Sequence, residues 1–306
     1  MEKNIIILSK KAGSGKKLLN KEKIEEIFSK NNKLDSLTII TTKDKEDVYN
    51  LSKYYSEKYG ENLKLFISGG DGSISEAIGG IVGTETKLGI LPTGTANDFA
   101  KYLYKKNVDP YKLIESSFEA ESKKMDLMAF GDSFAANIIS LGLDSVVLRD
   151  ALIGVEKNPS LGHLNYLKSV FKNLKNKKDY KISYEFVLEN GEIVKDEANI
   201  LIMAICNGAF YGSGFNPAPS ASVFDGVLDL VIAYKMKLGR FLLEIVKYKF
   251  GKNKESQYFK RFRIKELSIK SLSEKIPANY DGELFYLDEL NIKVLEKKIN
   301  LLILKP

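Results

Sequence analysis

Residues 63–81 read LKLFISGGDGSISEAIGGI, an apolar run that ends in three glycines around one aspartate and leads into a second apolar segment. The run from Leu63 to Ser68 has the length of a buried strand, and Ser73 to Ile81 is expected to form a helix. The same alternation surrounds this stretch, with strands expected at 4–8, 37–41 and 87–91 and helices at 17–30 and 44–59. Strands that alternate with helices predict parallel βαβ units and a layered α/β domain.

The pattern changes near Met125, where segments rich in β-branched and aromatic residues begin. These expected strands cover 125–130, 133–140, 180–189, 192–206, 227–234, 262–271 and 290–304. Gly131-Asp132 and Asn190-Gly191 are typical of hairpin turns between paired strands. Two helices are expected among them, at 164–176 and 238–250. We therefore expect a mainly antiparallel β domain after the α/β domain.

Composition excludes several classes of protein. A chain of 306 residues with 44% apolar content is expected to form two domains, each with its own core. One cysteine, Cys206, and one histidine, His163, exclude a disulfide framework, cysteine-cluster zinc sites and histidine-rich metal sites. Neither has a catalytic partner in the sequence, so both are expected to be structural. The short apolar run Ile5 to Leu8 does not suffice for a signal peptide, and a cytoplasmic protein is expected.

Positive charge is concentrated in one region. Between Lys235 and Lys275 the chain has thirteen Lys and Arg against four Glu, a local charge of +9 within a net charge of +7. One basic region on a nearly neutral protein indicates an anionic partner, such as a membrane surface, a nucleic acid or a phosphate-bearing substrate. A solvated surface is the alternative.

Two glycine-rich loops follow neighbouring expected strands. Gly69-Gly70-Asp71-Gly72-Ser73 follows the first, and Pro92-Thr93-Gly94-Thr95-Ala96-Asn97-Asp98 follows the second. Glycines bring backbone N–H groups close to phosphate oxygens, and a helix amino end favours anions. Because parallel strands place their following loops at one sheet edge, we expect the two loops to face each other. Asp71 would orient a phosphate-bound Mg²⁺ or a donor hydroxyl; an ordinary turn and a helix cap by Asn97 or Asp98 are the alternatives.

Three further segments carry less specific signals. Gly13-Ser14-Gly15-Lys16 follows the first strand but lacks the spacing of a P-loop. Asn279-Tyr280-Asp281-Gly282-Glu283 puts two carboxylates on one turn, where one could take a proton from an attacking hydroxyl. A surface hairpin turn is the simpler interpretation of this segment. Asp225 could cap a loop or ligate a metal.

Taken in order, these motifs resemble the diacylglycerol kinase catalytic-domain family, which includes bacterial lipid kinases and sphingosine kinases. The resemblance spans nearly the whole chain and rests on Gly69 to Ser73, Pro92 to Ala100, Asn207-Gly208, Tyr211 to Gly214, Asp225-Gly226 and Asp281 to Glu283. It implies ATP- and Mg²⁺-dependent phosphorylation of a lipid hydroxyl, with diacylglycerol as the expected substrate. It also implies a three-layer amino-terminal domain similar to NAD kinases and phosphofructokinases, and a β-sandwich carboxyl-terminal domain. The expected domains are 1–125 with about 290–306, for the nucleotide, and 126–289, for the lipid.

The resemblance also implies roles for individual residues. Glu283 is the better candidate for the general base, beside Asp281, and Asp225 would bind Mg²⁺ with the carbonyls of Ser222 and Val227. ATP would contact Ser9, Gly13, Thr42, Gly69, Gly70, Asp71, Gly72, Ser73, Thr95, Asn97 and Asp98. The chain departs from the family pattern at Ser9-Lys10, where Asn-Pro is usual, at Ser73, where Thr is usual, and at Phe224, where a second Asp is usual.

Several alternatives remain open at the level of the sequence. The acceptor could be a sphingoid base, phosphatidylglycerol or a polyprenol, whereas the Thr95 to Phe99 motif argues against NAD. A non-catalytic nucleotide-binding regulator is a second class, which would not need the Asp281 to Glu283 turn. No nucleic-acid-binding motif accompanies the basic region, so a peripheral, anionic membrane surface is the expected partner. Pairing of exposed strand edges would give a homodimer.

Overall fold

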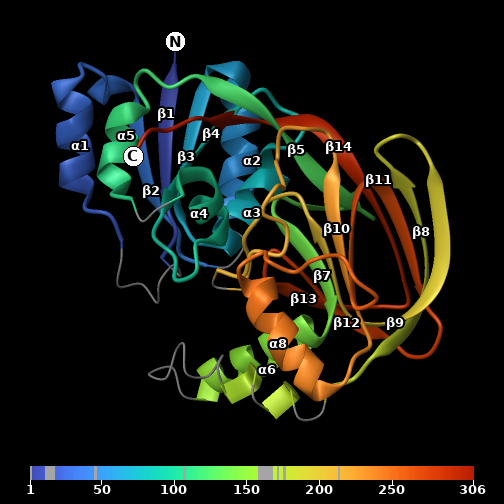
Figure 1. Cartoon of the computed structure of the whole chain (residues 1–306). Helices are drawn as coiled ribbons and strands as arrows, with labels where there is room; N and C mark the ends of the chain where they lie inside the picture. The colour runs from blue at the N-terminus through green and yellow to red at the C-terminus, as the bar shows by residue number, and fades with distance from the viewer. Residues whose placement is uncertain are drawn as a thin grey trace. The chain divides into compact units, whose positions relative to one another are not determined.

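The computed structural model describes residues 2–10, 18–44, 47–105, 108–157, 168–170, 172–174, 177–212 and 214–306 (Figure 1). The chain divides into two compact units. Unit 1 contains residues 1–127 and 295–306, and unit 2 contains residues 128–294. The chain passes from one unit to the other within two strands, β5 (Ser122–Phe130) and β14 (Glu289–Leu302).

Unit 1 is built on a parallel sheet in the order β2-β1-β3-β4. Its strands are β1 (Lys3–Leu8), β2 (Leu37–Thr41), β3 (Leu63–Gly69) and β4 (Lys87–Pro92). The end of β14 adds a fifth parallel strand, because Asn300 and Leu301 pair with Lys87 and Leu88. Every residue of β3 is buried, as expected for a central strand covered on both faces. The predicted alternation of strands and helices is confirmed here.

Helices cover both faces of this sheet. They are α1 (Lys21–Lys30), α2 (Asp47–Tyr59), α3 (Asp71–Ile81), α4 (Asp98–Tyr104) and α5 (Pro110–Ser116), with short 3₁₀ turns at Leu34–Ser36 and Gly60–Asn62. α1 and α5 pack together on one face, and α2 and α3 on the other (Figure 1). The strand order requires this division, since right-handed connections from β1 to β2 and from β2 back to β3 run over opposite faces.

Unit 2 is antiparallel throughout its described strands, as predicted. One continuous path runs β13-β12-β7-β9-β10-β11, and β8 pairs with both β9 and β11. The strands are β6 (Ser133–Ala135), β7 (Ile138–Gly142), β8 (Tyr180–Leu188), β9 (Ile193–Cys206), β10 (Leu228–Tyr234), β11 (Phe259–Ser271), β12 (Ile276–Tyr280) and β13 (Glu283–Leu287). The segment 133–140, predicted as one strand, is therefore divided into β6 and the start of β7.

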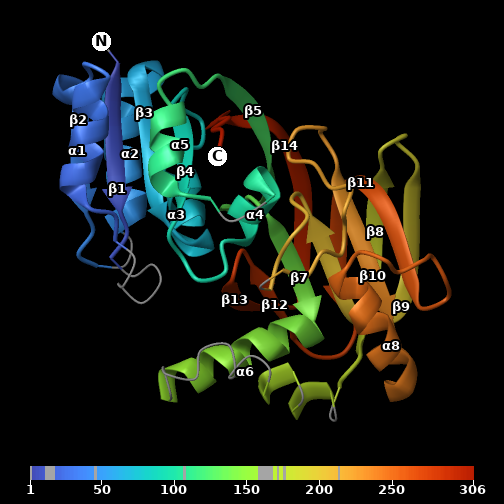
Figure 2. The ribbon, with the colours of Figure 1, turned by 60° about the vertical axis from the view of Figure 1, so that its left-hand side comes forward.

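The centre of this sheet is buried on both faces. Met203 and Ile205 of β9 belong to one apolar cluster, and Ile202 and Ala204 to a second, because successive side chains of a strand point to opposite sides. The second cluster is completed by two helices, α6 (Leu143–Lys157) and α8 (Leu238–Lys249), visible beside the sheet in Figure 2. Cys206 is buried in this cluster, as expected, and His163 lies outside the described residues.

α6 was not predicted. Its buried apolar residues Leu143, Val147 and Ala151 have helical spacing, and the helix follows directly on the strand β7. The predicted helix at 164–176 lies partly outside the described residues, and 168–170 and 172–174 are helical. None of the described helices is both long and apolar enough to cross a bilayer.

α2 and α3 approach each other at a glycine, which gives a test of the fold of unit 1. A Cβ at Gly80 would lie 2.6 Å from the Tyr49 carbonyl oxygen and 2.9 Å from the Lys53 nitrogen, whereas a Cβ at Gly79 would meet only ring carbons of Tyr49 at 3.5 Å. We expect Gly80→Ala to lower the free energy of unfolding by about 1–3 kcal/mol, the usual cost of overpacking. Gly79→Ala is the matched control and should be neutral or gain up to about 1 kcal/mol from helix propensity. Urea denaturation of both variants measures the difference, and equal stabilities would contradict the packing described.

Candidate functional site

The loops that follow the four parallel strands of unit 1 are joined at one edge of the sheet. The Ser9 nitrogen donates to the Ser68 carbonyl (2.9 Å), and the Ser73 hydroxyl donates to the Ser9 hydroxyl (2.9 Å). The Lys10 nitrogen donates to the Thr42 hydroxyl (3.0 Å), which ties the loop after β1 to the loop after β2. Ser9, Thr42 and Ser73, predicted to contact one ligand, therefore lie in one hydrogen-bonded group.

The loops after β3 and β4 are in direct backbone contact. The nitrogens of Thr93 and Gly94 both donate to the Gly69 carbonyl, at 3.0 and 3.1 Å. A Cβ at Gly94 would lie only 2.4 Å from the Gly70 Cα, so this approach requires a glycine. A Cβ at Gly69 would lie 2.5 Å from the Ser73 Cβ. The packing of one loop on the other therefore explains Gly94, and packing within the loop after β3 explains Gly69.

Asp71 connects the same two loops through its side chain. One carboxylate oxygen accepts the N–H of Asp98 (3.1 Å), and the other accepts the N–H of Phe99 (3.0 Å). These are first-turn N–H groups of α4, so Asp71 performs the capping that the sequence suggested for Asn97 or Asp98. Burial raises the pKa of the Asp71 carboxyl, although the two N–H donors act in the opposite direction. Its position indicates a residue that aligns the loops.

Asn97 and Asp98 also make local contacts. Asn97 occupies the amino-terminal cap position of α4 in a left-handed conformation (φ 51°), and its side-chain amide donates to the Gly94 carbonyl (2.9 Å). The buried Asn97 Oδ1 has no hydrogen-bond partner within the described part of the chain. Asp98 is buried and forms an ion pair with Lys101 (3.1 Å). Both side chains brace the loop in which Thr95 is exposed.

The amino end of α3 is the open part of this arrangement. Gly70 stands at the cap position and provides no capping side chain. Gly72 is exposed, and a Cβ there would meet nothing within 4 Å. The first-turn N–H groups of a helix carry partial positive charge and suit a phosphate. Gly13, the remaining residue predicted for this site, lies outside the described residues.

In unit 2, the predicted acidic turn connects β12 to β13. Asp281 (φ 46°) and Gly282 (φ 98°) both have positive φ, as a two-residue hairpin of this kind requires. The Asp281 carboxylate accepts three main-chain N–H groups, from Ala136 (2.7 Å), Asn137 (3.1 Å) and Ile138 (2.9 Å). Asp281 therefore fastens the turn to the segment that leads into β7.

Glu283 differs from Asp281 in every respect that matters for proton transfer. It is the first residue of β13, and its side chain is exposed. Within the described residues its carboxylate has neither a hydrogen-bond nor an ion-pair partner. A carboxylate with free oxygens can accept a proton, whereas one that already accepts three N–H groups is poorly placed to do so.

Asn137 and Asn207 hold the segment to which the acidic turn is bonded. Asn137 was not predicted to be a functional residue. The Asn137 carbonyl accepts the N–H groups of Asn207 (2.9 Å) and Gly208 (3.0 Å). The Asn207 amide donates to the Ala136 carbonyl (2.7 Å), and the Asn137 amide donates to the Phe210 carbonyl (2.8 Å). A buried Asn within the apolar run 134–141 is the signal that could have identified it, since buried amides need partners.

In the loop that carries the predicted Mg²⁺ ligands, the Asp225 carboxylate is paired with an arginine. The Asp225 carboxylate pairs with the Arg263 guanidinium (3.0 Å), which also pairs with Glu189 (2.9 Å). Phe224 stands where the family pattern has a second carboxylate, and no group of three His, Cys, Asp or Glu side chains that could hold a metal occurs among the described residues. Mg²⁺ takes six oxygen ligands in octahedral geometry, several of them usually water, and it binds through one or two carboxylates. Because Asp225, the one carboxylate beside the carbonyls of Ser222 and Val227, is already paired with Arg263, this arrangement does not fit a resident Mg²⁺.

A buried carboxylate lines a small cavity between α6, α8 and the sheet of unit 2. The cavity has a volume of about 40 Å³, and its walls include Leu143, Val147, Ile202, Phe241, Ile245 and Tyr248. The Asp144 carboxylate accepts the Ser145 N–H (2.8 Å) and the Tyr211 hydroxyl (3.1 Å). Burial raises the pKa of Asp144 to about 6. The cavity is thus apolar with one titratable wall residue.

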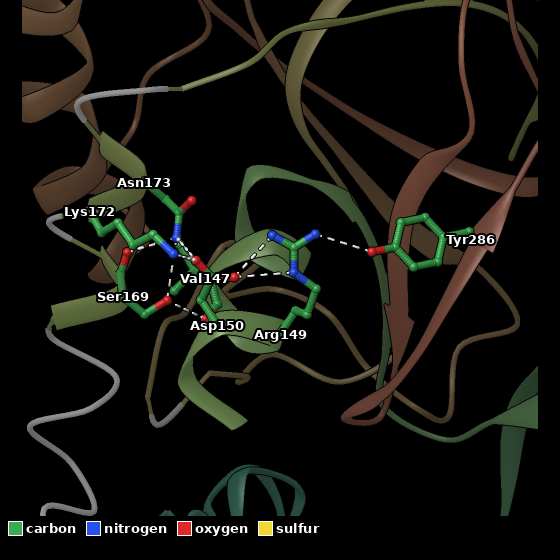
Figure 3. Close-up of polar contacts among 7 residues, drawn as sticks. All are labelled: Val147, Arg149, Asp150, Ser169, Lys172, Asn173 and Tyr286. Atoms are coloured by element: carbon green, nitrogen blue, oxygen red, sulfur yellow. Dashed lines mark hydrogen bonds and ion pairs between the residues drawn. The ribbon is translucent and has the colours of Figure 1, made fainter. Parts of the chain in front are cut away.

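A network of ion pairs and hydrogen bonds connects α6 to β13 (Figure 3). The Arg149 guanidinium donates to Asp150 (3.0 and 3.1 Å) and, at its other end, to the Tyr286 hydroxyl (3.1 Å). Asp150 also accepts Lys172 (2.7 Å) and Asn173 (3.1 Å). Burial opposes ionisation of Asp150, but these donors outweigh it and lower its pKa to about 2. The network fixes α6 against the strand that begins at Glu283.

Comparison with known proteins agrees with this geometry. Residues 3–130 match the family model of the diacylglycerol kinase catalytic domain, and residues 137–303 match that of the YegS C-terminal NAD kinase beta sandwich-like domain. The diacylglycerol kinase of Bacillus subtilis strain 168 is 25% identical over 222 residues, which are 72% of this chain and 70% of the relative. A solved structure of a diacylglycerol kinase from Bacillus anthracis strain Sterne has a TM-score of 0.69 at 19% identity and covers 100% of this chain and 97% of that one. The structural likeness confirms the predicted fold class.

Asp144 gives a prediction about pH. An unperturbed aspartate carboxyl has a pKa of 3.8, whereas that of Asp144 is about 6 in the folded protein, so the folded state holds a proton that the unfolded chain releases. Stability attributable to this group is therefore present near pH 4 and is lost as the pH rises through about 6. At roughly 1.4 kcal/mol for each pH unit between the two values, the loss is about 3 kcal/mol.

Asp144→Asn keeps the shape of the side chain without the charge. We expect its free energy of unfolding to fall less than that of the wild type between about pH 4 and pH 7, by an amount on the order of 3 kcal/mol. Urea denaturation across this range measures the difference. Asp132→Asn, at an exposed turn, is the control and should keep the wild-type profile. Parallel profiles for Asp144→Asn and the wild type would contradict the burial described.

The Arg263–Asp225 pair gives a prediction about metal removal. In the absence of nucleotide, we expect the melting temperature to be the same in EDTA as in millimolar Mg²⁺, because a guanidinium already neutralises Asp225. In Arg263→Gln the positive charge is gone, and Mg²⁺ should then raise the melting temperature. Differential scanning fluorimetry measures both. A rise of several degrees with Mg²⁺ in the wild type would show that the loop binds the ion after all.

Proposed function

Because the chain belongs to the diacylglycerol kinase family of lipid kinases, we propose that it transfers the γ-phosphoryl group of ATP to the hydroxyl of diacylglycerol. The product would be phosphatidic acid. The observation that carries this proposal is the contrast between the two acidic residues of the β12–β13 turn. The Asp281 carboxylate accepts three main-chain N–H groups, whereas Glu283, two positions further along, is exposed and free to act.

Unit 1 is the proposed nucleotide domain. The first-turn N–H groups of α3, at Gly72 and Ser73, would face the phosphates of ATP, and the exposed Thr95 hydroxyl would add a donor. Ser9 and Thr42 would lie at the far side of the same group of loops. Asp71, Asn97 and Asp98 would act by holding these loops in register, since their side chains are engaged with main-chain and lysine partners.

Phosphoryl transfer demands little covalent chemistry from a protein. It needs positioned phosphates, neutralised charge and an oriented nucleophile. Glu283 would accept the proton of the lipid hydroxyl as that oxygen bonds to the γ-phosphorus and ADP leaves. A divalent cation would arrive bound to the ATP phosphates. No step is assigned to a metal at Asp225, because its carboxylate pairs with Arg263.

Unit 2 is the proposed lipid domain. The cavity beside α6 and α8 has the apolar walls that a hydrocarbon chain needs, but its volume of about 40 Å³ is close to that of a single water. An acyl chain therefore requires one of the two helices, α8 or α6, to move outward. The buried Asp144 would make a poor neighbour for acyl carbons alone and a better one for a polar part of the substrate.

Glu283→Gln is the central test. Purified protein with ATP and Mg²⁺ would be offered diacylglycerol, sphingosine, phosphatidylglycerol and a polyprenol in mixed micelles. We expect labelled phosphate in diacylglycerol with the wild type and a rate about 10²–10⁴-fold lower with the variant, the usual contribution of a general base. ATP binding should be unchanged. Glu289→Gln, an exposed carboxylate on β14, is the matched control and should keep the wild-type rate.

Asp281→Asn separates the two carboxylates of the turn. An amide replaces one of the oxygens that accept N–H groups, so this variant should lose about 1–3 kcal/mol of stability. Glu283→Gln should lose none. Label in a different lipid would change the substrate assignment. ATP binding without transfer to any lipid would favour a nucleotide-binding regulator instead of a kinase.

A further inference from the structure

Helix α8 exposes large apolar side chains on the face that points away from the protein. Its inner face is buried through Phe241 and Tyr248, which pack in the second apolar cluster of unit 2. On the outer face Leu243, Val246 and Phe250 are 64%, 57% and 59% exposed, and Leu238 and Leu242 are also exposed. We call the four residues Leu242, Leu243, Val246 and Phe250 the outer stripe, because their spacing places them on one side of a helix.

This exposure is concentrated here. Five of the fifteen exposed large hydrophobic residues found among the described residues fall between Leu238 and Phe250. Single exposed apolar residues are ordinary on a protein surface, whereas a contiguous apolar stripe is typical of a surface that binds another protein or a membrane.

Basic residues border the outer stripe on both sides. Arg240 and Lys247 lie on one side at helical spacing, and both pair with the buried carboxylate of Glu244, at 2.6 and 3.1 Å. Lys249 lies on the other side. Glu244 carries one negative charge and Arg240 and Lys247 carry two positive charges, so a net positive charge remains. The two ion pairs also fix the position of both basic side chains. The exposed Lys237, Lys252 and Lys254 adjoin the helix, and Glu255 is the only other acid between Lys235 and Tyr258.

We propose that the outer stripe of α8 and its basic border form a docking surface for an anionic lipid bilayer. The helix would lie in the plane of the interface, with the stripe among the acyl chains and the lysines at the level of the lipid phosphates. The charge selects this occupant. A second copy of the chain would bring the same positive border against its own, and an uncharged apolar partner would leave the border unused.

This inference rests on the proposed function and adds a route for its substrate. The inner side of the same helix forms a wall of the cavity, through Phe241, Ile245 and Tyr248. A helix that touches the bilayer with one face and the cavity with the other is the wall that must move when an acyl chain leaves the bilayer. The second helix of the cavity, α6, is fixed instead by the Arg149–Asp150 network (Figure 3).

The test is vesicle binding by a variant that keeps the fold. Leu243→Gln combined with Val246→Gln removes the two most central residues of the stripe, and both are exposed, so the fold should be retained. The probes are vesicles of phosphatidylcholine with 30% phosphatidylserine and vesicles of phosphatidylcholine alone, with sedimentation as the readout. We expect the wild type to prefer the anionic vesicles and the double variant to bind them at least 10-fold more weakly. Ile193→Gln, at an exposed residue of β9, is the matched control and should bind as the wild type does.

Two further measurements make the result unambiguous. Lys249→Gln combined with Lys252→Gln should weaken binding and reduce its dependence on salt concentration, because fewer charges then contact the lipid phosphates. A short-chain diacylglycerol dispersed as monomers should be phosphorylated equally by the wild type and the Leu243/Val246 variant. The wild type could phosphorylate neither form of diacylglycerol while the Leu243/Val246 variant still loses vesicle binding. That result would contradict the proposed function and support the docking surface.

Three outcomes would overturn the docking surface. Equal binding of the wild type and the double variant to anionic vesicles is the first. Equal binding of the wild type to both kinds of vesicle is the second. The third is a wild-type dimer, measured by analytical ultracentrifugation, that the double variant converts to a monomer with no change in vesicle binding, since the stripe would then be covered by a second copy.

Discussion

The carboxylate of Asp71 is the interaction on which the candidate nucleotide site depends. It accepts two N–H groups from the start of α4, 27 and 28 positions further along the chain, and so fixes the loop after β4 against the loop after β3. The same two loops meet at Gly70 and Gly94, where a Cβ on Gly94 would lie 2.4 Å from the Gly70 Cα. The raised pKa of Asp71 reflects its burial, which a carboxylate tolerates when charge-assisted hydrogen bonds offset the loss of water.

In unit 2 the acidic turn is held by the same kind of interaction, an aspartate carboxylate that accepts main-chain N–H groups. Asp281 accepts three N–H groups from residues 136–138, and Asn207 in turn holds the Ala136 carbonyl. In each unit an aspartate of the motif, Asp71 or Asp281, holds two backbone segments together. The groups that remain available to a ligand are next to it in the sequence. These groups are the main-chain N–H groups at the start of α3 in one unit and the Glu283 carboxylate in the other. A short acid whose oxygens accept main-chain N–H groups fixes the backbone well, whereas a longer and exposed one is better suited to exchange a proton.

Sequence patterns predicted the elements better than the side-chain partners. The alternation of strands and helices, the antiparallel second half and the turn at Asp281-Gly282 all follow from local residue preferences. α6 was missed because it begins at Leu143, directly after β7, so no loop residues in the sequence separate the strand from the helix. The role of Asp71 could not be read locally, since an aspartate in a glycine-rich turn is compatible with a metal, a phosphate or a distant helix end. The same holds for Arg263, whose partner Asp225 lies 38 positions away.

The basic region shows what charge counting alone leaves out. The local charge between Lys235 and Lys275 is +9, but much of it lies on β11, where Arg261 donates to the Pro217 and Asn253 carbonyls and Arg263 pairs with two carboxylates. These arginines serve the structure. Lys260, Lys265 and Lys270 of the same strand are exposed, and most of the other positive charge is on and beside α8, where it borders exposed apolar side chains instead of polar ones. Lysines around an apolar stripe suit the boundary between acyl chains and phosphates, because the two parts of the surface then match the two layers of that boundary. A nucleic acid would use the charge and leave the stripe in water.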